Sequence, residues 1–150
     1  MTEAATTSAS EPSGIGGWLL LPAIGIVVAP IQFTMNVLDY FPRIELLQPG
    51  TLFHTMTLVE VLAWIAFAIL ATTTAIHFFT RRKTAPTLYR ALLVGQLLFV
   101  VGAYWVAALL FSKPMFDASS GFAIGKWLLA CLIWIPYFLY STRVRNTFVR

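Results

Sequence analysis

Residues 91–112 read ALLVGQLLFVVGAYWVAALLFS, a run of 22 residues without a charged side chain. A helix needs about 20 mostly apolar residues to cross about 30 Å of hydrocarbon, so this run is long enough to span a membrane. Three more uncharged runs occur in the chain: 27 residues between Glu11 and Asp39, 20 residues at 61–80 and 16 residues at 127–142. The sequence therefore predicts an all-α, multi-pass membrane protein, with four transmembrane helices in a compact bundle.

The composition of the whole chain agrees with a place in a membrane. Of its 150 residues, 59% are hydrophobic and 11% are charged, and the mean hydropathy is +0.80. A soluble domain has about 25% charged residues and could not bury so much apolar surface at this length. These values argue against a soluble enzyme, a nucleic-acid binder and a secreted disulfide scaffold. The single cysteine, Cys131, also excludes an intramolecular disulfide and a thiolate metal site.

The uncharged runs and their flanking residues define the expected organisation. Residues 1–13 are small and polar and lack the basic start of a cleavable signal peptide, so we expect a disordered tail there. Residues 14–150 form one domain that ends in a short basic tail, residues 141–150. The expected helices cover about residues 16–38, 57–79, 88–111 and 121–140.

Basic residues predict how the helices are oriented. Seven lie on one side of the expected bundle, in the loop after the second helix and in the C-terminal tail: Arg81, Arg82, Lys83, Arg90, Arg143, Arg145 and Arg150. The loops of the other side contain only Arg43 and Lys113. Because cytoplasmic loops carry an excess of Lys and Arg, we expect both termini in the cytoplasm. Arg81, Arg82, Lys83, Arg143 and Arg145 are the expected contacts for anionic lipid headgroups or for an acidic partner, and we expect no nucleic-acid partner.

The first expected helix is irregular. Pro22 and Pro30 each remove a backbone donor, and Gly25 lies between them, so we expect a kink. Interrupted helices build substrate sites in many transporters, yet proline is also tolerated in membrane helices without any such role. In the fourth helix, Gly121 and Gly125 form a GxxxG pattern, which allows close helix packing either inside the bundle or with a second copy.

Two charged residues, Glu60 and Lys126, fall inside expected helices, where a charge is costly and indicates function. Glu60 lies 21 residues before Arg81 and Lys126 lies 17 before Arg143, or roughly 31 and 25 Å from the inner face. The two therefore share an outer layer. Glu60 has three interpretations: the last residue of a capping box that begins at Thr57, a structural ion pair with Lys126, or a carboxylate that binds a proton or cation in a small transporter.

Other polar residues in the helices offer little catalytic chemistry. His54 and His77 lie 23 residues apart, about 34 Å along a continuous helix, and cannot bind one metal or haem together. Gln32, Asn36 and Gln96 are expected to form hydrogen bonds between helices. No catalytic triad, phosphate-binding loop or paired carboxylate is present, so we expect no enzyme activity, no metal and no cofactor.

The two ends of the chain carry a family resemblance. The sequences GIGGWL (14–19), IPYF (135–138) and STRVRNTF (141–148) are similar to the opening and closing signatures of domain of unknown function family 2569. The S-x-R-V-x-x-T-F pattern is the more specific part, and this chain has Arg145 where lysine is usual. The resemblance implies a small bacterial inner-membrane protein with four helices, and it implies no activity and no cofactor.

The C-terminal tail also has a physical interpretation. If the fourth helix continues beyond the membrane, Tyr137, Ser141, Val144 and Phe148 lie along one stripe, and the basic residues point elsewhere. Such a segment would rest on the membrane surface or bind a cytoplasmic partner.

Two functions remain open on the sequence. The first hypothesis is a structural or accessory subunit that assembles with itself or with a larger membrane complex. The alternative is a small transporter or channel that uses the kinked first helix and Glu60. A polar cavity that reaches Glu60 would favour the transporter, and a dry, packed bundle would favour the accessory subunit.

Overall fold

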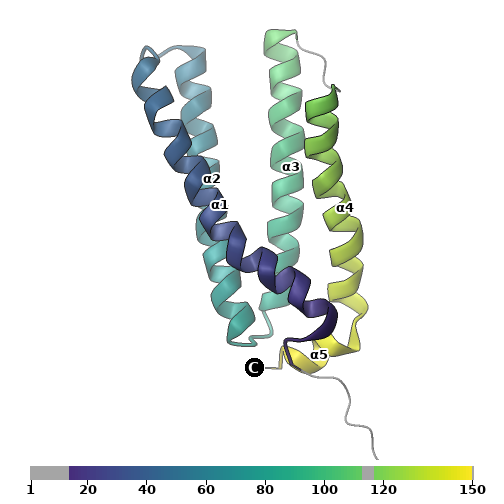
Figure 1. Ribbon diagram of the computed structural model, residues 1–150. Helices are drawn as coiled ribbons and strands as arrows, with labels where there is room; N and C mark the ends of the chain where they lie inside the picture. The colour runs from purple at the N-terminus through teal and green to yellow at the C-terminus, as the bar shows by residue number, and fades with distance from the viewer. Residues whose placement is uncertain (1–13, 113–116, 150) are drawn as a thin grey trace, which may run out of the picture.

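The computed structural model describes residues 14–112 and 117–149, and its long elements are α-helices (Figure 1). Within these residues, four helices are long and apolar enough to cross a membrane. They are α1 (Leu20–Leu46), α2 (Leu52–Phe79), α3 (Ala85–Phe111) and α4 (Ala118–Tyr140). A 3₁₀ turn, η1 (Gly17–Leu19), precedes α1, and a short helix, α5 (Thr142–Thr147), follows α4. The tail expected at 1–13, Lys113 and Arg150 lie outside the described residues.

The prediction of an all-α chain with four candidate spans is confirmed, but several predicted helix ends were wrong. Helix α1 continues for eight residues beyond Leu38, and α2 begins at Leu52 rather than at Thr57. Asp39 ends an uncharged run of the sequence, but backbone hydrogen bonds continue the helix beyond this charge. Helices α3 and α4 also begin three residues earlier than predicted, at Ala85 and Ala118.

The kink expected in the first helix takes the form of a bend within a continuous helix. Pro30 and Pro42 lie inside α1, and α1 bends about midway along its length in Figure 1. Proline cannot donate to the carbonyl one turn before it, so the helix opens slightly at this point. The Thr34 hydroxyl donates to the carbonyl oxygen of Pro30 at 2.8 Å and satisfies a backbone acceptor next to the bend.

The helices pack as two hairpins, α1 with α2 and α3 with α4, which meet at the end of the molecule that holds the termini (Figure 1). The main cluster of buried apolar side chains lies at that end and includes Leu19, Ile26, Phe78 and Phe138. Towards the other end the hairpins separate. The bundle is therefore compact at one end only, because the bend in α1 carries its second half away from α3 and α4.

The outer surfaces of the helices suit a lipid environment. Large apolar side chains such as Leu62, Leu98 and Leu132 are more than half exposed. Consecutive threonines in α2 satisfy their hydroxyls within the helix, since Thr72, Thr73 and Thr74 each donate to the carbonyl four residues before. Polar side chains of this kind add no unsatisfied donor to the hydrocarbon.

The start of α4 is fixed by a reciprocal cap. The backbone N–H of Ser120 donates to the Asp117 carboxylate at 2.7 Å, and the backbone N–H of Asp117 donates to the Ser120 hydroxyl at 2.8 Å. The bonds that the carboxylate accepts from the Ser120 backbone N–H and from the Ser119 hydroxyl lower the pKa of Asp117 from 3.8 to about 2. The carboxylate therefore stays ionised and caps the helix at any physiological pH.

The chain ends form a clasp, which we define as the contact of residues 14–17 with residues 143–148. Gly14 donates its backbone N–H to the Thr147 hydroxyl at 2.9 Å, and the Arg143 guanidinium lies against Gly16 and Gly17. Gly17 has a φ of +56°, a conformation that glycine adopts without strain. The clasp brings together the two segments that carry the family resemblance.

The C-terminal tail does not continue the fourth helix, as its interpretation from the sequence had assumed. The backbone of Ser141 is extended, with ψ at 121°, and the side chain of this residue caps the separate helix α5 instead. Val144 and Phe148 do share one side of the tail, but they are buried against Leu19 and Phe78 of the bundle. Their apolar surface is therefore used in packing and is not free to contact lipid or a partner.

Candidate functional site

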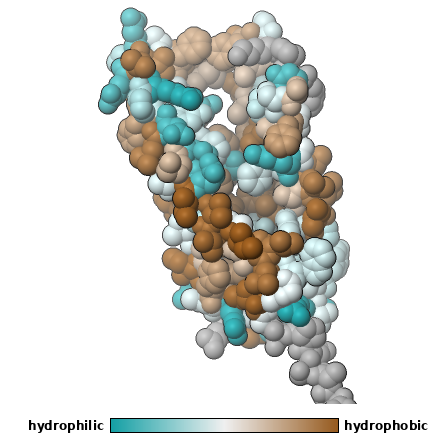
Figure 2. Space-filling view, viewed as in Figure 1, coloured by the Kyte–Doolittle hydropathy of each residue, from teal (hydrophilic) through white to brown (hydrophobic). Residues whose placement is uncertain are grey.

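A cavity of about 600 Å³ lies between the two hairpins, in the half of the bundle away from the termini. All four long helices line it: α1 with residues from Gln32 to Tyr40, α2 with Glu60 and Trp64, α3 with residues from Gln96 to Ala107, and α4 with Ala123, Lys126 and Trp127. Figure 2 shows the hollow between the hairpins, with hydrophilic residues on both sides of it. Its volume lies in the range of about 300–1,000 Å³ that is usual for small-molecule sites.

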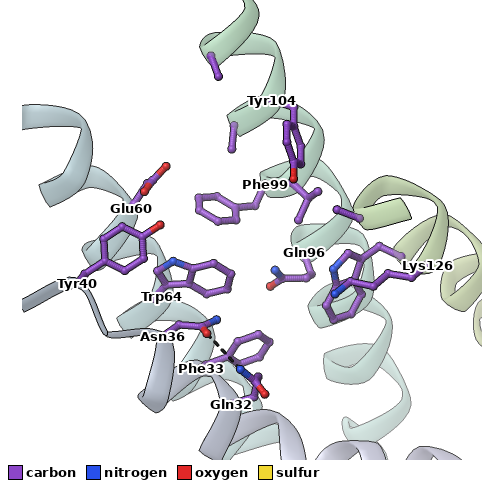
Figure 3. A pocket seen from close by; sticks show the side chains of 15 residues that line it. Gln32, Phe33, Asn36, Tyr40, Glu60, Trp64, Gln96, Phe99, Tyr104 and Lys126 are labelled. Carbon is purple, nitrogen blue, oxygen red and sulfur yellow. Dashed lines mark hydrogen bonds between the residues drawn. The ribbon is translucent and has the colours of Figure 1, made fainter. Parts of the chain in front are cut away.

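Glu60 lies on the α2 side of the cavity and is half-buried. The Tyr40 hydroxyl of α1 faces its carboxylate (Figure 3). The predicted capping box was wrong: Thr51 caps α2, and the Thr57 hydroxyl donates instead to the carbonyl oxygen of Phe53 at 2.9 Å. Glu60 therefore sits more than two turns inside the helix, where its side chain is available to the cavity.

Lys126 extends from α4 into the same cavity (Figure 3). Its ammonium nitrogen lies 5.7 Å from the ring centroid of Trp127, within the range of a cation–π contact. Among the residues that the structure describes, no ion pair of 4.0 Å or less joins Lys126 to Glu60. The two charges face one space from different hairpins, and a third chemical group could lie between them.

Three amides add polar atoms to the cavity. Gln32 donates to the Asn36 side chain at 3.2 Å, a bond within α1 rather than the expected bond between helices (Figure 3). Gln96 of α3 is only 1% exposed, and its side-chain oxygen has no hydrogen-bond partner among the described residues. A buried amide oxygen without a partner costs about 1–3 kcal/mol, so Gln96 is an acceptor that a ligand or water would satisfy.

Aromatic rings separate the cavity from the packed core beneath it. Trp64 lies 5.8 Å from Phe33 and 5.1 Å from Phe99, measured between ring centroids. Phe67, in the next turn of α2, packs against the same rings and against Gly95, where an added methyl group would lie 3.3 Å from the Phe67 ring. The cavity is therefore closed towards the termini by rigid rings and has its polar groups above them.

The basic residues expected at lipid headgroups lie elsewhere. Arg81, Arg82 and Lys83 are exposed in the turn between α2 and α3, where the His77 ring nitrogen Nδ1 lies 2.6 Å from the Thr84 hydroxyl. Arg145 is exposed in the last turn of α5. Arg143 belongs to the clasp and lies against the backbone of residues 16 and 17.

Sequence reasoning singled out Glu60 and Lys126, and the structure places both at one cavity. It gave less weight to Gln96 and did not consider Trp64, whose indole N–H also lacks a well-aligned partner among the described residues. Their only signal in the sequence is a polar atom inside an apolar run. The described residues contain no group of three His, Cys, Asp or Glu side chains that could hold a metal ion.

Comparisons with known proteins found one matching family model and a relative of similar length. The model of a family described as "Protein of unknown function (DUF2569)" matches residues 12–149. The chain is 30% identical over 147 residues to a protein of Escherichia coli (strain K12) named inner membrane protein YdgK, and the match covers 93% of this chain and 97% of that protein. No solved structure matches.

These matches confirm the resemblance carried by the two chain ends. The four apolar helices and the inner-membrane relative together support a multi-pass protein of the bacterial inner membrane. Because the family model covers almost the whole length, the chain belongs to the DUF2569 family of proteins of unknown function.

Proposed function

We propose that this protein is a small carrier of the inner membrane, which binds an ionic ligand in the cavity between its hairpins and releases it chemically unchanged. The observation that carries the proposal is a partly polar cavity of about 600 Å³ that reaches Glu60. A dry, packed bundle would have favoured an accessory role. We propose that Glu60 holds the cationic group of the ligand or exchanges a proton with it.

The energetics of the cavity support a ligand. A carboxylate at membrane depth is costly unless it is paired or hydrated, and no lysine or arginine lies within ion-pair distance of Glu60 among the described residues. The Tyr40 hydroxyl faces the Glu60 carboxylate and satisfies part of it, and the unpartnered oxygen of Gln96 adds an unsatisfied acceptor in the same space. A ligand with a cationic group and hydrogen-bond donors would satisfy both.

The bend in α1 supports a carrier rather than a rigid binding protein. Gln32, Asn36 and Tyr40 all lie on the part of α1 that follows Pro30. Movement of this half-helix about the bend would change the width of the cavity without disturbing the packed end. With the termini in the cytoplasm, as the basic residues predict, the cavity lies in the periplasmic half of the membrane.

Labelling with a lipophilic carbodiimide, which modifies carboxyl groups at membrane depth, tests the proposal. We expect modification at Glu60 in the purified full-length protein, and we expect millimolar ethanolamine to slow it at least fivefold by occupying the site. Peptide mapping by mass spectrometry locates the label. Glu60→Gln should remove it, whereas Glu45→Gln, the same change at an exposed position of α1, should leave both labelling and protection unchanged. The proposal would be overturned if ethanolamine, choline and sodium all left the rate of Glu60 labelling unchanged.

An accessory subunit is the second candidate function, and one observation favours it. At Gly121 and Gly125 of α4, no described atom apart from the neighbouring backbone of the same helix lies within 4 Å of the place that a Cβ would take, so this GxxxG pattern is not used inside the described part of the chain. Such a surface allows another helix to approach closely. Crosslinking in the membrane, followed by mass spectrometry, tests this role, and Gly121→Ile should abolish any crosslink that depends on the surface.

A further inference from the structure

A second hollow, of about 410 Å³, lies between α2 and α3 and is lined mainly by apolar side chains. Met56 and Val59 come from α2, and Leu98, Val106 and Phe111 come from α3. Val59 is 59% exposed and Leu98 is 66% exposed, so the edges of the hollow lie on the outer surface of the bundle, which faces hydrocarbon in a membrane. We call this hollow the side groove.

The side groove adjoins the cavity between the hairpins, and the two spaces share part of their lining. Glu60, Phe99, Ala103 and Ala107 line both spaces. The only side chain with a charge among the residues that line the groove is Glu60, at the junction. At Gly102, no described atom lies within 4 Å of the place that a Cβ would take, which keeps the groove open at its middle.

The combined space has the shape and polarity of an amphiphile. Its inner part offers a carboxylate, an ammonium group and an unpartnered amide oxygen, and its outer part offers apolar side chains. A water-soluble solute would leave the groove unused, whereas a molecule from the bilayer could enter through it without leaving the hydrocarbon. The opposite charges of Glu60 and Lys126, on different hairpins, fit a headgroup that itself carries both signs.

We propose that the ligand is a membrane phospholipid whose headgroup joins a phosphate to a primary amine. The amine lies at Glu60 and near the oxygen of Gln96, the phosphate lies at Lys126, and one acyl chain occupies the side groove. This inference rests on the proposed function, because it names the ligand class of the same cavity. The aromatic rings of Trp64 and Phe99 form the surface on which the headgroup rests.

The test uses protection of Glu60 from the carbodiimide, measured for the full chain in detergent with four probes. These are lysophosphatidylethanolamine, phosphatidylethanolamine, phosphatidylglycerol and free ethanolamine. We expect the two amine-bearing lipids to protect Glu60 at concentrations at least tenfold below that of ethanolamine, because the acyl chain adds apolar burial. Phosphatidylglycerol, which has the phosphate and the chains but no amine, should protect at least tenfold less well than phosphatidylethanolamine.

Variants of the side groove separate this inference from the proposed function. Gly102→Leu, and Val106→Trp one turn further along α3, should fill the groove and raise the protecting concentration of phosphatidylethanolamine at least tenfold. Neither variant should change the protection of Glu60 by ethanolamine. Unchanged protection by ethanolamine also shows that the variant is folded. Gly25→Leu, at a glycine of α1 that likewise has no described atom near it, is the matched control and should behave as the wild type.

The results of the protection assay separate the lipid inference from the proposed function. If phosphatidylethanolamine protects the groove variants as well as the wild type, or if phosphatidylglycerol protects equally well, the lipid inference is wrong and the carrier proposal stands. If ethanolamine, choline and sodium all fail to protect the wild type, the proposed function fails as well. A photoactivatable group in the acyl chain provides a direct measurement: it should crosslink to residues of the side groove such as Met56, and crosslinks to the outer face of α4 instead would contradict the inference.

Discussion

Gln96 of α3 lines the cavity between the hairpins. Its side chain is almost fully buried, and its oxygen accepts no hydrogen bond from the described residues. Glu60 could be picked out from the sequence because a charge inside an apolar run is rare at any depth. Gln96 could not be ranked in the same way, because the cost of an amide depends on which donors surround it, and only packing decides that.

Replacement of Gln96 should therefore stabilise the protein and weaken its site. We expect Gln96→Leu to raise the free energy of unfolding by about 1–3 kcal/mol, because it removes an unsatisfied buried acceptor at similar volume. The same change should weaken the ethanolamine protection of Glu60. Unfolding by dodecyl sulfate in mixed micelles measures the first effect, and Gln48→Leu, at an exposed position, is the control. A Gln96→Leu protein less stable than the wild type would show that the amide has a partner in solution.

At the scale of elements, the ends of the helices and the clasp depend on polar contacts that hydropathy does not report. Apolar runs located the four helices, but α1 continues beyond Asp39 and α2 begins eight residues before Glu60. The family signatures could be recognised in the amino-acid sequence at both ends of the chain. Their mutual contact, which joins residues 133 positions apart through Gly14 and Thr147, followed only from the fold.

The clasp should contribute measurably to stability. Thr147 is 2% exposed, and its hydroxyl accepts from Gly14 and donates to the carbonyl oxygen of Arg143 at 2.7 Å. Thr147→Val keeps the volume and removes these bonds, so we expect a loss of about 1–2 kcal/mol in the free energy of unfolding. Thr142→Val, at an exposed position of the same short helix, should change it by less than about 0.5 kcal/mol. Equal values for the two variants would show that the clasp is not formed in the membrane protein.

At the scale of the whole molecule, the two hairpins share one packed end and separate at the other (Figure 1). The cavity lies between the separated parts and is lined by all four long helices. A four-helix prediction says nothing of this asymmetry, since a uniform bundle would bury the same apolar runs. The bend in α1 and the large rings of Trp64, Phe67 and Phe99 hold the hairpins apart above the core.

Thiol labelling should detect this asymmetry and the orientation together. In a Cys131→Ala background, a cysteine at Ala107, which lines the cavity, should react with a membrane-impermeant maleimide added from the periplasmic side. A cysteine at Ala68, which packs against the buried cluster around Phe33, should react only after denaturation. Gel-shift labelling of spheroplasts measures both. Reaction of Ala107→Cys only in inverted vesicles would reverse the proposed orientation, and no reaction before denaturation would show that the cavity is dry.

The sequence by itself predicted four helices long and apolar enough to span a membrane, and it carried the resemblance to the family. It also singled out Glu60 and Lys126 as charges inside the expected helices. These properties are local: they depend on the composition of each run and on residue identity, which every helix carries whatever its neighbours are. The tertiary structure alone decided that the two charges face one cavity without pairing, that Gln96 is left without a partner, and that the chain ends meet in a clasp. Each of these depends on the angles at which helices cross, and those angles follow from the packing of side chains far apart in the sequence.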